Sequence, residues 1–398
     1  MIRSKNAGGR CTEAASPIEI YIHIPFCVKK CAYCDFISGP QDEETIAQYV
    51  VSLSDEIRAH GSNRELVTSY EVSSIFLGGG TPSILNVDQI QGIFEILKTS
   101  FEISRNAEIT IEANPGTVTK EKLLTYRACG INRISFGLQS ANNDELKLLG
   151  RIHTYEEFLE SFRLARECGF DNINVDLISA IPKQTLASWE ETLQNVIKLN
   201  PEHISAYSLI VEEGTPFAKV YGEGCPREQD LPSEEEERKI YYRTEELLKA
   251  AGYHRYEISN YAKEGKECKH NLGYWERKEY LGIGLGSASL IDNTRYKNTD
   301  DLAYYMEHAG ELTAIQEDIQ VLSTKEQMEE FMFLGLRKME GISEIEFKKC
   351  FGVGIEEVYG IQLEKLKRED LLENKDGWIR LTERGIDVSN YVFSEFIN

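Results

Sequence analysis

The 398-residue sequence lacks any hydrophobic run long enough to cross a bilayer. A transmembrane helix needs about 18 or more consecutive apolar residues, and no stretch approaches that length. Residues 1–16 carry two early cations, Arg3 and Lys5, but no apolar centre of the kind found in a secretory signal. We therefore expect no stable membrane insertion, and we expect residues 1–17 to form a disordered lead-in.

Positive charge is also scarce. The chain has 44 Lys and Arg against 66 Asp and Glu, which gives a formal net charge of −22. Phosphate backbones and anionic lipid surfaces repel such a chain. A nucleic acid partner would need a strong local basic patch, and the sequence has none, so we expect no nucleic acid partner.

The nine cysteines lack the even number that a disulfide framework needs. In a long acidic chain without a signal, this indicates the reducing cytoplasm. Three of them, Cys27, Cys31 and Cys34, fall within eight residues, and the other six are scattered along the chain. The three clustered thiols are therefore the candidates for chemistry.

Short β-rich apolar segments alternate with amphipathic helical patterns through the first half of the chain. The six strand candidates are Glu19–Pro25, Ser73–Leu77, Glu108–Glu112, Arg133–Gly137, Asn172–Ile178 and His203–Ile210. The helical patterns between them are 43–60, 87–101, 120–129, 155–168 and 186–199. This alternation indicates a parallel sheet with helical crossovers. We predict an α/β fold, an incomplete (β/α)6 barrel of the TIM type over residues 18–215, with its chemistry at the carboxyl ends of the strands.

The composition changes after residue 215. We expect residues 216–319 to be a connector that holds the segment His270-Asn271-Leu272-Gly273-Tyr274-Trp275. Residues 320–398 show helical patterns followed by a hairpin, 371–381, which together predict a winged-helix-like α+β domain. Residues 321–398 hold 11 Lys and Arg and 16 Asp and Glu, a net charge of −5. We therefore expect this domain to pack on the barrel or cover it rather than bind DNA.

The sequence Cys27-Val-Lys-Lys-Cys31-Ala-Tyr-Cys34 directly follows the first predicted strand. Thiolates are the usual protein ligands of iron–sulfur clusters. Three of them can bind three irons of a cubane and leave the fourth iron open to a chelating small molecule. A zinc site is the alternative, but zinc usually takes four ligands, and no fourth Cys or His lies nearby on the same loop. We predict a [4Fe–4S] cluster on these three cysteines.

Polar and glycine residues stand at the ends of the later strands. The run Gly78-Gly79-Gly80-Thr81-Pro82 ends the second strand, and glycine allows close approach of a ligand to the backbone. Glu112, Gln139, Arg151 and Asp176 stand near the ends of the strands that follow. Together they could hold a zwitterion: a carboxylate for an ammonium, a guanidinium for a carboxylate, and an amide and an acid for ribose hydroxyls.

The cysteine spacing, and its place after the first strand of an α/β barrel, resemble the radical-SAM superfamily. In that family the amino and carboxylate groups of S-adenosylmethionine chelate the open iron, and the reduced cluster cleaves the sulfonium. The resemblance implies a [4Fe–4S] cluster, S-adenosyl-L-methionine and an electron donor for the cluster. The cofactor brings this chemistry, and the protein contributes position and electrostatics.

The whole set, with Tyr21-Ile-His-Ile-Pro-Phe before Cys27, resembles the coproporphyrinogen-oxidase-like branch over about residues 18–380. This resemblance implies contacts to S-adenosylmethionine from Tyr21, Gly79, Gly80, Thr81, Glu112, Gln139, Arg151 and Asp176. Two functions occur in the branch. One is the oxidative decarboxylation of two propionates of coproporphyrinogen III to vinyls, and the other is the delivery of heme to an acceptor protein.

Two features favour the heme chaperones of the branch. The oxidases carry a fourth cysteine two positions after the third, and here that position is Phe36. The segment 270–275 matches H-N-x-x-Y-W, which the resemblance links to heme binding, and a histidine is a plausible axial ligand. The alternative for His270 is a hydrogen-bonded loop histidine. We expect a radical-SAM heme chaperone that binds heme at His270, with an unknown acceptor protein; whether the chain forms a homodimer stays open.

Overall fold

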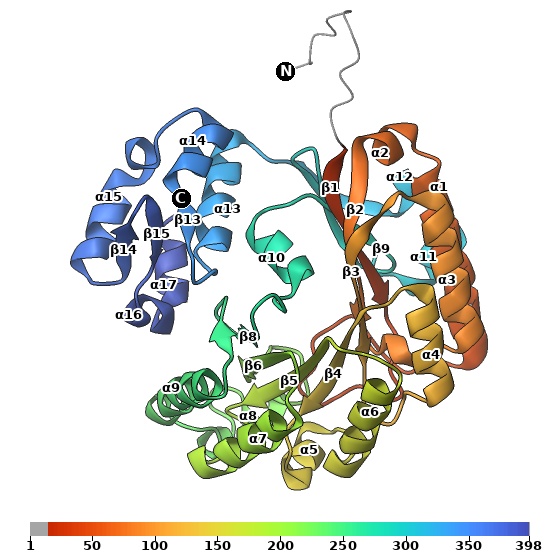
Figure 1. Cartoon of the computed structure of the whole chain (residues 1–398), viewed down its shortest axis with the longest axis horizontal. Helices are drawn as coiled ribbons and strands as arrows, with labels where there is room; N and C mark the ends of the chain where they lie inside the picture. The colour runs from red at the N-terminus through yellow and green to blue at the C-terminus, as the bar shows by residue number, and fades with distance from the viewer. Residues whose placement is uncertain (1–14, 398) are drawn as a thin grey trace, which may run out of the picture.

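Six neighbouring parallel strands form the centre of the structure, a computed structural model that describes residues 15–397. Most of the predicted lead-in, residues 1–14, lies outside the described residues, and the first strand already begins at Ser16. The strands follow one another across the sheet in chain order (Figure 1): β1 (Ser16–Ile24), β2 (Tyr70–Gly79), β3 (Ile103–Ala113), β4 (Arg133–Gln139), β5 (Ile173–Ser179) and β6 (His203–Ser208). The predicted incomplete (β/α)6 barrel is confirmed.

The crossover helices lie on the outer face of the curved sheet (Figure 1). The five predicted helices are α1 (Glu43–Gly61), α3 (Val87–Ser100), α4 (Lys120–Cys129), α6 (Tyr155–Glu167) and α7 (Leu186–Leu199). Each follows a residue whose side chain accepts a hydrogen bond from the first turn: Asp42, Asn86, Thr119, Thr154 and Thr185. Such N-caps each stabilise a helix by about 1 kcal/mol. Shorter helices fill other connections: α2 (Arg64–Ser69), α5 (Asn143–Leu149) and α8 (Ala218–Tyr221).

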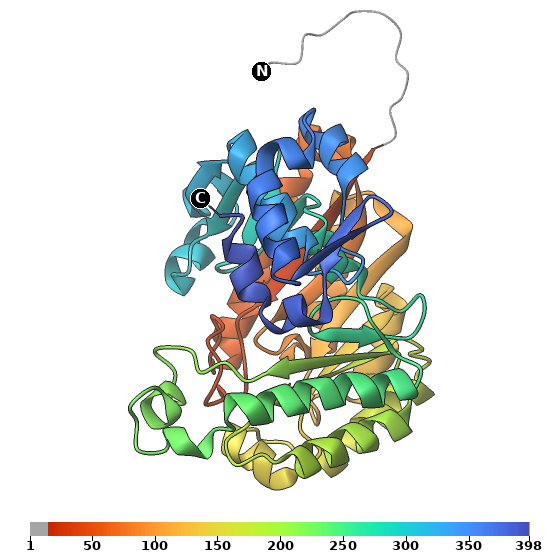
Figure 2. The ribbon, with the colours of Figure 1, turned by 90° about the vertical axis from the view of Figure 1, so that its left-hand side faces the viewer.

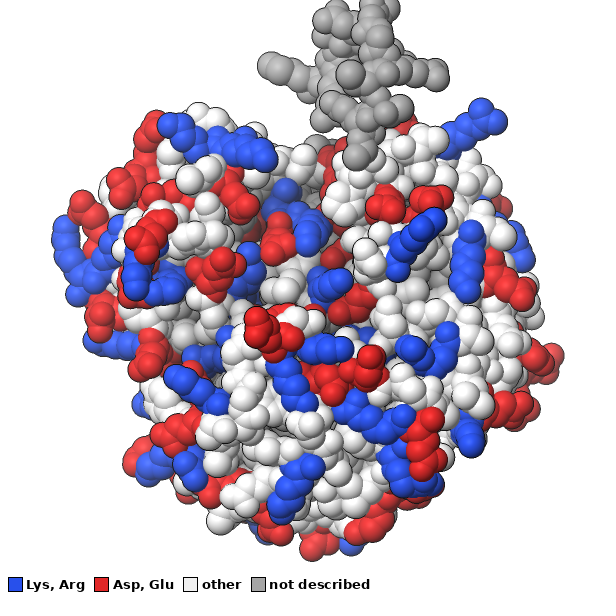
Figure 3. All heavy atoms as spheres, in the orientation of Figure 1, with Lys and Arg blue, Asp and Glu red and all other residues white. Residues whose placement is uncertain are grey.

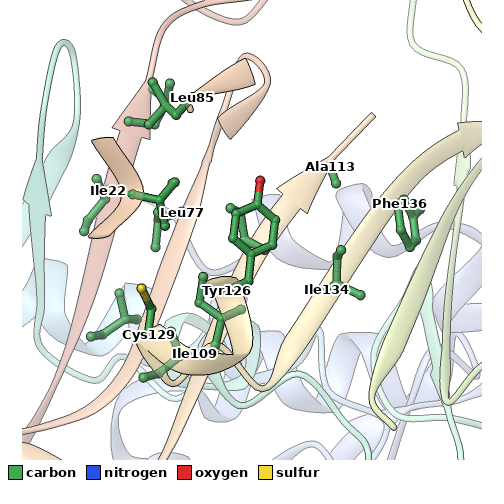
Figure 4. Packing of buried hydrophobic residues seen from close by; sticks show 14 of the residues in the cluster. Ile22, Leu77, Leu85, Ile109, Ala113, Tyr126, Cys129, Ile134 and Phe136 are labelled. Carbon is green, nitrogen blue, oxygen red and sulfur yellow. The ribbon is translucent and has the colours of Figure 1, made fainter. Parts of the chain in front are cut away.

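The two faces of the central strands have opposite character. The helix-facing positions are apolar, and Figure 4 shows Ile22, Leu77 and Ile134 there, with Tyr126 and Cys129 of α4 in the same buried cluster. Because successive side chains point to opposite faces, the intervening positions face the lumen. They are largely polar: Glu19, Tyr21, His23, Ser74, Glu108, Glu112, Arg133, Ser135, Asn174, Asp176, His203 and Ser205. A polar lumen is suited to ligands, whereas a closed TIM barrel fills its interior with branched apolar residues.

The region predicted as a connector extends the sheet at both edges. Next to β1 lies β9 (Tyr280–Ile283), followed by β10 (Ala288–Ile291), β11 (Thr294–Asn298) and β12 (Gln316–Val321). At the other edge, β8 (Asn260–Ala262) and β7 (His254–Arg255) pair antiparallel beyond β6. The helices of this region are α9 (Glu234–Ala250), α10 (Lys269–Trp275), α11 (Leu302–His308) and α12 (Leu312–Ile315). The segment is therefore part of the barrel domain rather than a separate linker.

The C-terminal residues form a second unit with a core of its own. Helices α13 (Thr324–Gly335), α14 (Glu344–Phe351) and α15 (Ile355–Arg368) precede the hairpin β14 (Leu372–Lys375) and β15 (Trp378–Leu381). The short strand β13 (Ile342–Ser343) completes a three-stranded sheet, and α16 (Glu383–Asp387) and α17 (Ser389–Ser394) end the chain. This is the predicted winged-helix-like arrangement. Figure 2 shows the unit from the side on which it covers the barrel.

The distribution of charged residues on the surface agrees with the sequence, which has no strong basic patch. Figure 3 shows Lys and Arg interspersed with Asp and Glu over the visible face of the described residues, with no broad patch of Lys and Arg alone. Within residues 15–397, no helix is both long enough and apolar enough to span a membrane.

Candidate functional site

The cysteine loop leaves the carboxyl end of β1 and is fixed at its base. Cys27 N donates to Gly39 O at 3.0 Å, and Gly39 N donates to Pro25 O at 3.0 Å. These two backbone hydrogen bonds close the loop between residues 25 and 39. Its far side is held by Ala32, whose N–H donates to Leu149 O at 3.2 Å. The loop therefore presents its three thiols from a fixed platform rather than from a free segment.

Cys27, Cys31 and Cys34 line one pocket, which we call the outer pocket. It has a volume of about 430 Å³ and also includes Gly79, Gly80, Thr81, Glu112, Gln139, Arg151 and Asp176. The three thiols are free and partly exposed, and burial raises the pKa of Cys34. Within residues 15–397, no three His, Cys, Asp or Glu side chains converge as metal ligands. The three thiols thus share one wall of the outer pocket.

The glycine run at the end of β2 brings the backbone close to the cysteine loop. A Cβ on Gly80 would lie 2.6 Å from Phe26 O, so only glycine fits against the base of the cysteine loop. Gly79 has a φ of +109°, which other residues rarely adopt, and its N–H donates to Glu112 Oε2 at 3.2 Å. Burial, together with the neighbouring Asp176, raises the pKa of Glu112 to about 8. The run therefore joins the cysteine loop to an acidic group.

Arg151 connects the far side of the outer pocket to the cysteine loop. Its Nη2 donates to Asn114 Oδ1 at 2.6 Å and to Gly137 O at 2.7 Å, while Nη1 lies 3.4 Å from Cys31 Sγ. Asn114 in turn donates to Thr81 Oγ1 at 2.7 Å, and Thr81 Oγ1 lies 3.5 Å from Cys27 Sγ. A chain of polar contacts thus links Cys31 to Cys27 through Arg151, Asn114 and Thr81.

Gln139 occupies a strained backbone position at the end of β4. Its φ is +74°, and the β4–β5 pairing shifts register between Gly137 and Gln139. A non-glycine residue at positive φ costs of order 1–3 kcal/mol, and such residues cluster at ligand sites. The bulge turns Gln139 toward the outer pocket that it lines.

Tyr21 and His270, the two predicted ligand-binding residues that do not line the outer pocket, line a second cavity deeper in the lumen, which we call the inner chamber. It has a volume of about 380 Å³ and also includes Phe76, Glu112, Arg133, Asp176, Asn271 and Tyr274. Glu112 and Asp176 belong to both cavities, so they form the partition between them. Tyr21 is held there by a 3.0 Å hydrogen bond between its hydroxyl and His23 Nδ1.

His270 is a buried, fully bonded residue on α10. Nδ1 lies 2.8 Å from Ser74 Oγ, Nε2 lies 3.1 Å from Tyr274 OH, and the ring stacks on Phe76 with centroids 5.2 Å apart. Burial, with the charge of Arg133, lowers the pKa of His270 to about 3, so the imidazole is neutral at physiological pH. The side chain thus belongs to the chamber wall and not to an exposed loop.

The other residues of the motif hold α10 in place. A Cβ on Gly273 would come within 1.9 Å of the Glu19 carboxylate, so the helix approaches β1 only with glycine there. The Trp275 ring lies beneath the Arg337 guanidinium at 4.4 Å, and Arg337 follows α13 of the C-terminal unit. The motif therefore joins the lumen to the C-terminal unit.

Sequence reasoning missed two residues. Asn114 follows Glu112 by two residues, but its role as the link between Thr81 and Arg151 depends on chain segments far apart. Arg133 was treated as the first residue of a strand, although a charged residue that alternates with apolar ones indicates a lumen position. It is 2 % exposed and lines the inner chamber.

Comparisons with known proteins agree with this geometry. Residues 21–196 match the Radical SAM superfamily, and residues 322–388 match the HemN C-terminal domain. The chain is 36 % identical over 384 residues to the heme chaperone HemW of Lactococcus lactis, which covers 96 % of this chain and 97 % of that protein. It is 37 % identical over 382 residues to the heme chaperone HemW of Bacillus subtilis, covering 95 % and 98 %.

Among solved structures, coproporphyrinogen III oxidase (HemN) of Escherichia coli is similar with a TM-score of 0.83 and 25 % identity. The superposition covers 96 % of this chain and 90 % of the oxidase. The fold and the site thus define a radical-SAM protein. The chain belongs to the radical-SAM superfamily and, within it, to the coproporphyrinogen-oxidase-like branch that contains the HemW proteins. Its cofactors follow from that family: a [4Fe–4S] cluster and S-adenosylmethionine.

Proposed function

We propose that this protein is a heme chaperone: it binds heme and hands it to an acceptor protein, with a [4Fe–4S] cluster on Cys27, Cys31 and Cys34. The observation that carries the proposal is the similarity, over nearly the whole chain, to proteins named heme chaperone HemW. Phe36, 66 % exposed, adds support, because the oxidase pattern has a cysteine at that position.

The outer pocket suits S-adenosylmethionine in charge and shape. Arg151 offers a half-buried guanidinium for the methionine carboxylate, and Glu112 and Asp176 offer acidic groups for the amino group and the ribose. Gly79, Gly80 and Thr81 bring the backbone against the same space, and the strained Gln139 closes its rim. When bound, the cluster and S-adenosylmethionine supply one-electron chemistry at this pocket. The cluster requires an external electron donor.

His270 can serve as a heme contact only after a local rearrangement. Its Nε2 is engaged by Tyr274 OH, so bonding to iron requires the tyrosine hydroxyl to turn away. The imidazole is already neutral, because burial lowers the pKa of His270 to about 3, so no proton would have to leave for it to bind iron. We propose this contact as the iron ligand, with Tyr274 as the group that covers it in the heme-free protein.

The second candidate function is the oxidase activity of the branch, which the 0.83 TM-score to the E. coli oxidase favours. The inner chamber lies directly behind the partition formed by Glu112 and Asp176, where a substrate would meet the cofactor. The two functions differ in outcome: a chaperone releases heme unchanged, whereas an oxidase converts propionate side chains to vinyl groups.

Heme titration of three variants tests the proposed contact. His270→Ala should shift or weaken the Soret band, because it removes the iron ligand. Tyr274→Phe should keep the band and bind heme at least as tightly, because it frees Nε2 without removing the imidazole. Tyr126→Phe is the matched control: Tyr126 is a buried tyrosine on α4, outside the chamber, so the band should not change. A wild-type band unchanged in His270→Ala would reject His270 as the ligand.

A further inference from the structure

The inner chamber holds a buried cation that its surroundings leave unpaired. Arg133 is 2 % exposed, and no hydrogen bond or ion pair reaches its guanidinium from residues 15–397. Its Nε is fully enclosed and has no partner at all. Burial works against this charge, but the surrounding acidic groups raise the pKa of Arg133, so the guanidinium stays charged.

The nearby carboxylates do not account for the position of this guanidinium. Asp176 accepts hydrogen bonds on both oxygens, from Ser135 at 2.9 Å and from Asn174 at 2.8 Å. Glu108 Oε1 accepts from the backbone N–H of His270 at 3.3 Å and lies 3.5 Å from Cys268 Sγ. Both carboxylates raise the pKa of Arg133 by their charge, but the hydrogen bonds that they accept come from other groups. Burying a charge without a partner is costly, so an unpaired guanidinium beside a cavity indicates a ligand anion.

We infer that Arg133 is the recognition residue of a carboxylate site in the inner chamber, and that a propionate arm of the bound heme is its occupant. The inference rests on the proposed heme function. A carboxylate can accept two parallel hydrogen bonds from a guanidinium, which is the strongest pairing available to arginine. A phosphate would bring up to two negative charges beside Asp176, so the singly charged carboxylate fits better.

The chamber places Arg133 close to His270, the proposed iron ligand. Its volume of about 380 Å³ lies near the lower end of the roughly 300–1,000 Å³ typical for small-molecule sites. His270 shares the chamber wall with Arg133, and the two are close enough for Arg133 to help lower the pKa of His270. A propionate held by Arg133 thus lies beside His270, so that one heme molecule can contact both residues.

Esterified heme separates this site from heme binding in general. Cluster-loaded wild-type protein should bind iron mesoporphyrin more tightly than its dimethyl ester, by about tenfold to a hundredfold, the range expected for a charged hydrogen-bonded pair. Arg133→Met should bind both forms equally, and Arg133→Lys should recover part of the preference. Arg255→Met is the matched control, because Arg255 is 7 % exposed but pairs with Glu245 away from the chamber. It should keep the full preference for the free acid.

Thermal unfolding checks that Arg133 is not simply structural. Because its guanidinium has no partner, Arg133→Met should leave the Tm unchanged or raise it, whereas Arg255→Met should lower it. A large fall in the Tm of Arg133→Met would overturn the inference. Equal binding of the free acid and the ester by the wild type would also overturn the inference, but it would leave the proposed heme function intact. Failure of the wild type to bind either form would instead reject the heme function, and this inference with it.

Discussion

The affinity for S-adenosylmethionine should depend on pH through Glu112. Its pKa is raised to about 8, first by burial and then by Asp176, so the carboxyl group is mostly protonated at neutral pH. The proposed pocket brings the amino group of S-adenosylmethionine to Glu112, and the ligand also carries a sulfonium cation. Positive charge near Glu112 favours its ionised form. Binding should therefore require Glu112 to lose its proton.

The size of this effect follows from the pKa. Each pH unit below the pKa adds about 1.4 kcal/mol to the cost of ionising the group. At pH 7 the cost is about 1.4 kcal/mol, and at pH 6 it is about 2.7 kcal/mol. The Kd should therefore fall about tenfold from pH 6 to pH 7, fall further toward pH 8, and level off above it.

The assay is isothermal titration of S-adenosylmethionine into cluster-loaded, unreduced protein under anaerobic conditions, so that no turnover occurs. Glu112→Gln keeps the size of the side chain and should remove most of the slope, while weakening binding at high pH by about tenfold. Glu121→Gln, on the exposed first turn of α4, should keep the wild-type slope. An identical pH slope in wild type and Glu112→Gln would refute the reasoning, because the titrating group would then be another one.

Three further outcomes follow from the site and the core. Cys31→Ala should abolish the thiolate-to-iron absorption after anaerobic reconstitution, while Cys129→Ala should retain it; stoichiometric zinc without iron would contradict the cluster. Arg151→Ala should weaken S-adenosylmethionine binding by at least about tenfold, since it removes a half-buried charged partner, and an unaltered Kd by dialysis would contradict its role. Burial, with the charge of Arg151, lowers the pKa of His153 to about 4. Below about pH 6.5 His153 therefore binds a proton in the unfolded chain, whereas in the folded chain it stays neutral down to about pH 4. The stability of wild type relative to His153→Gln, measured by urea unfolding, should therefore fall by about 2 kcal/mol between pH 8 and pH 5, and a constant difference would exclude this linkage.

The six central strands could be predicted because each has one uniformly apolar face. In β4 and β5 the alternation of Ile134, Phe136, Ile173 and Val175 with polar residues follows from packing against helices on one side only. The strands at the sheet edges carry no such signal. β7 has only two residues, His254–Arg255, and β9 pairs with β1 across most of the chain, a contact that no local pattern encodes.

Some residues of the candidate site could also be predicted from the sequence, and others could not. Residues within compact motifs, such as Cys27 and Gly80, could be assigned from spacing, and the structure brings them to one pocket. The burial of His270 could not be foreseen, because it depends on Gly273 allowing α10 to approach Glu19. The unpaired state of Arg133 also arises only in three dimensions, from Asp176 and its neighbours bonding to one another instead.

We propose that the protein carries heme and does not decarboxylate a porphyrinogen. The most direct test uses one anaerobic preparation with a full cluster and S-adenosylmethionine, divided between a heme titration and a coproporphyrinogen III turnover assay. We expect a Soret band distinct from that of free heme, transfer of that heme to an added apoprotein, and no vinyl product. Robust decarboxylation without a heme band would contradict the account and make the protein an oxidase.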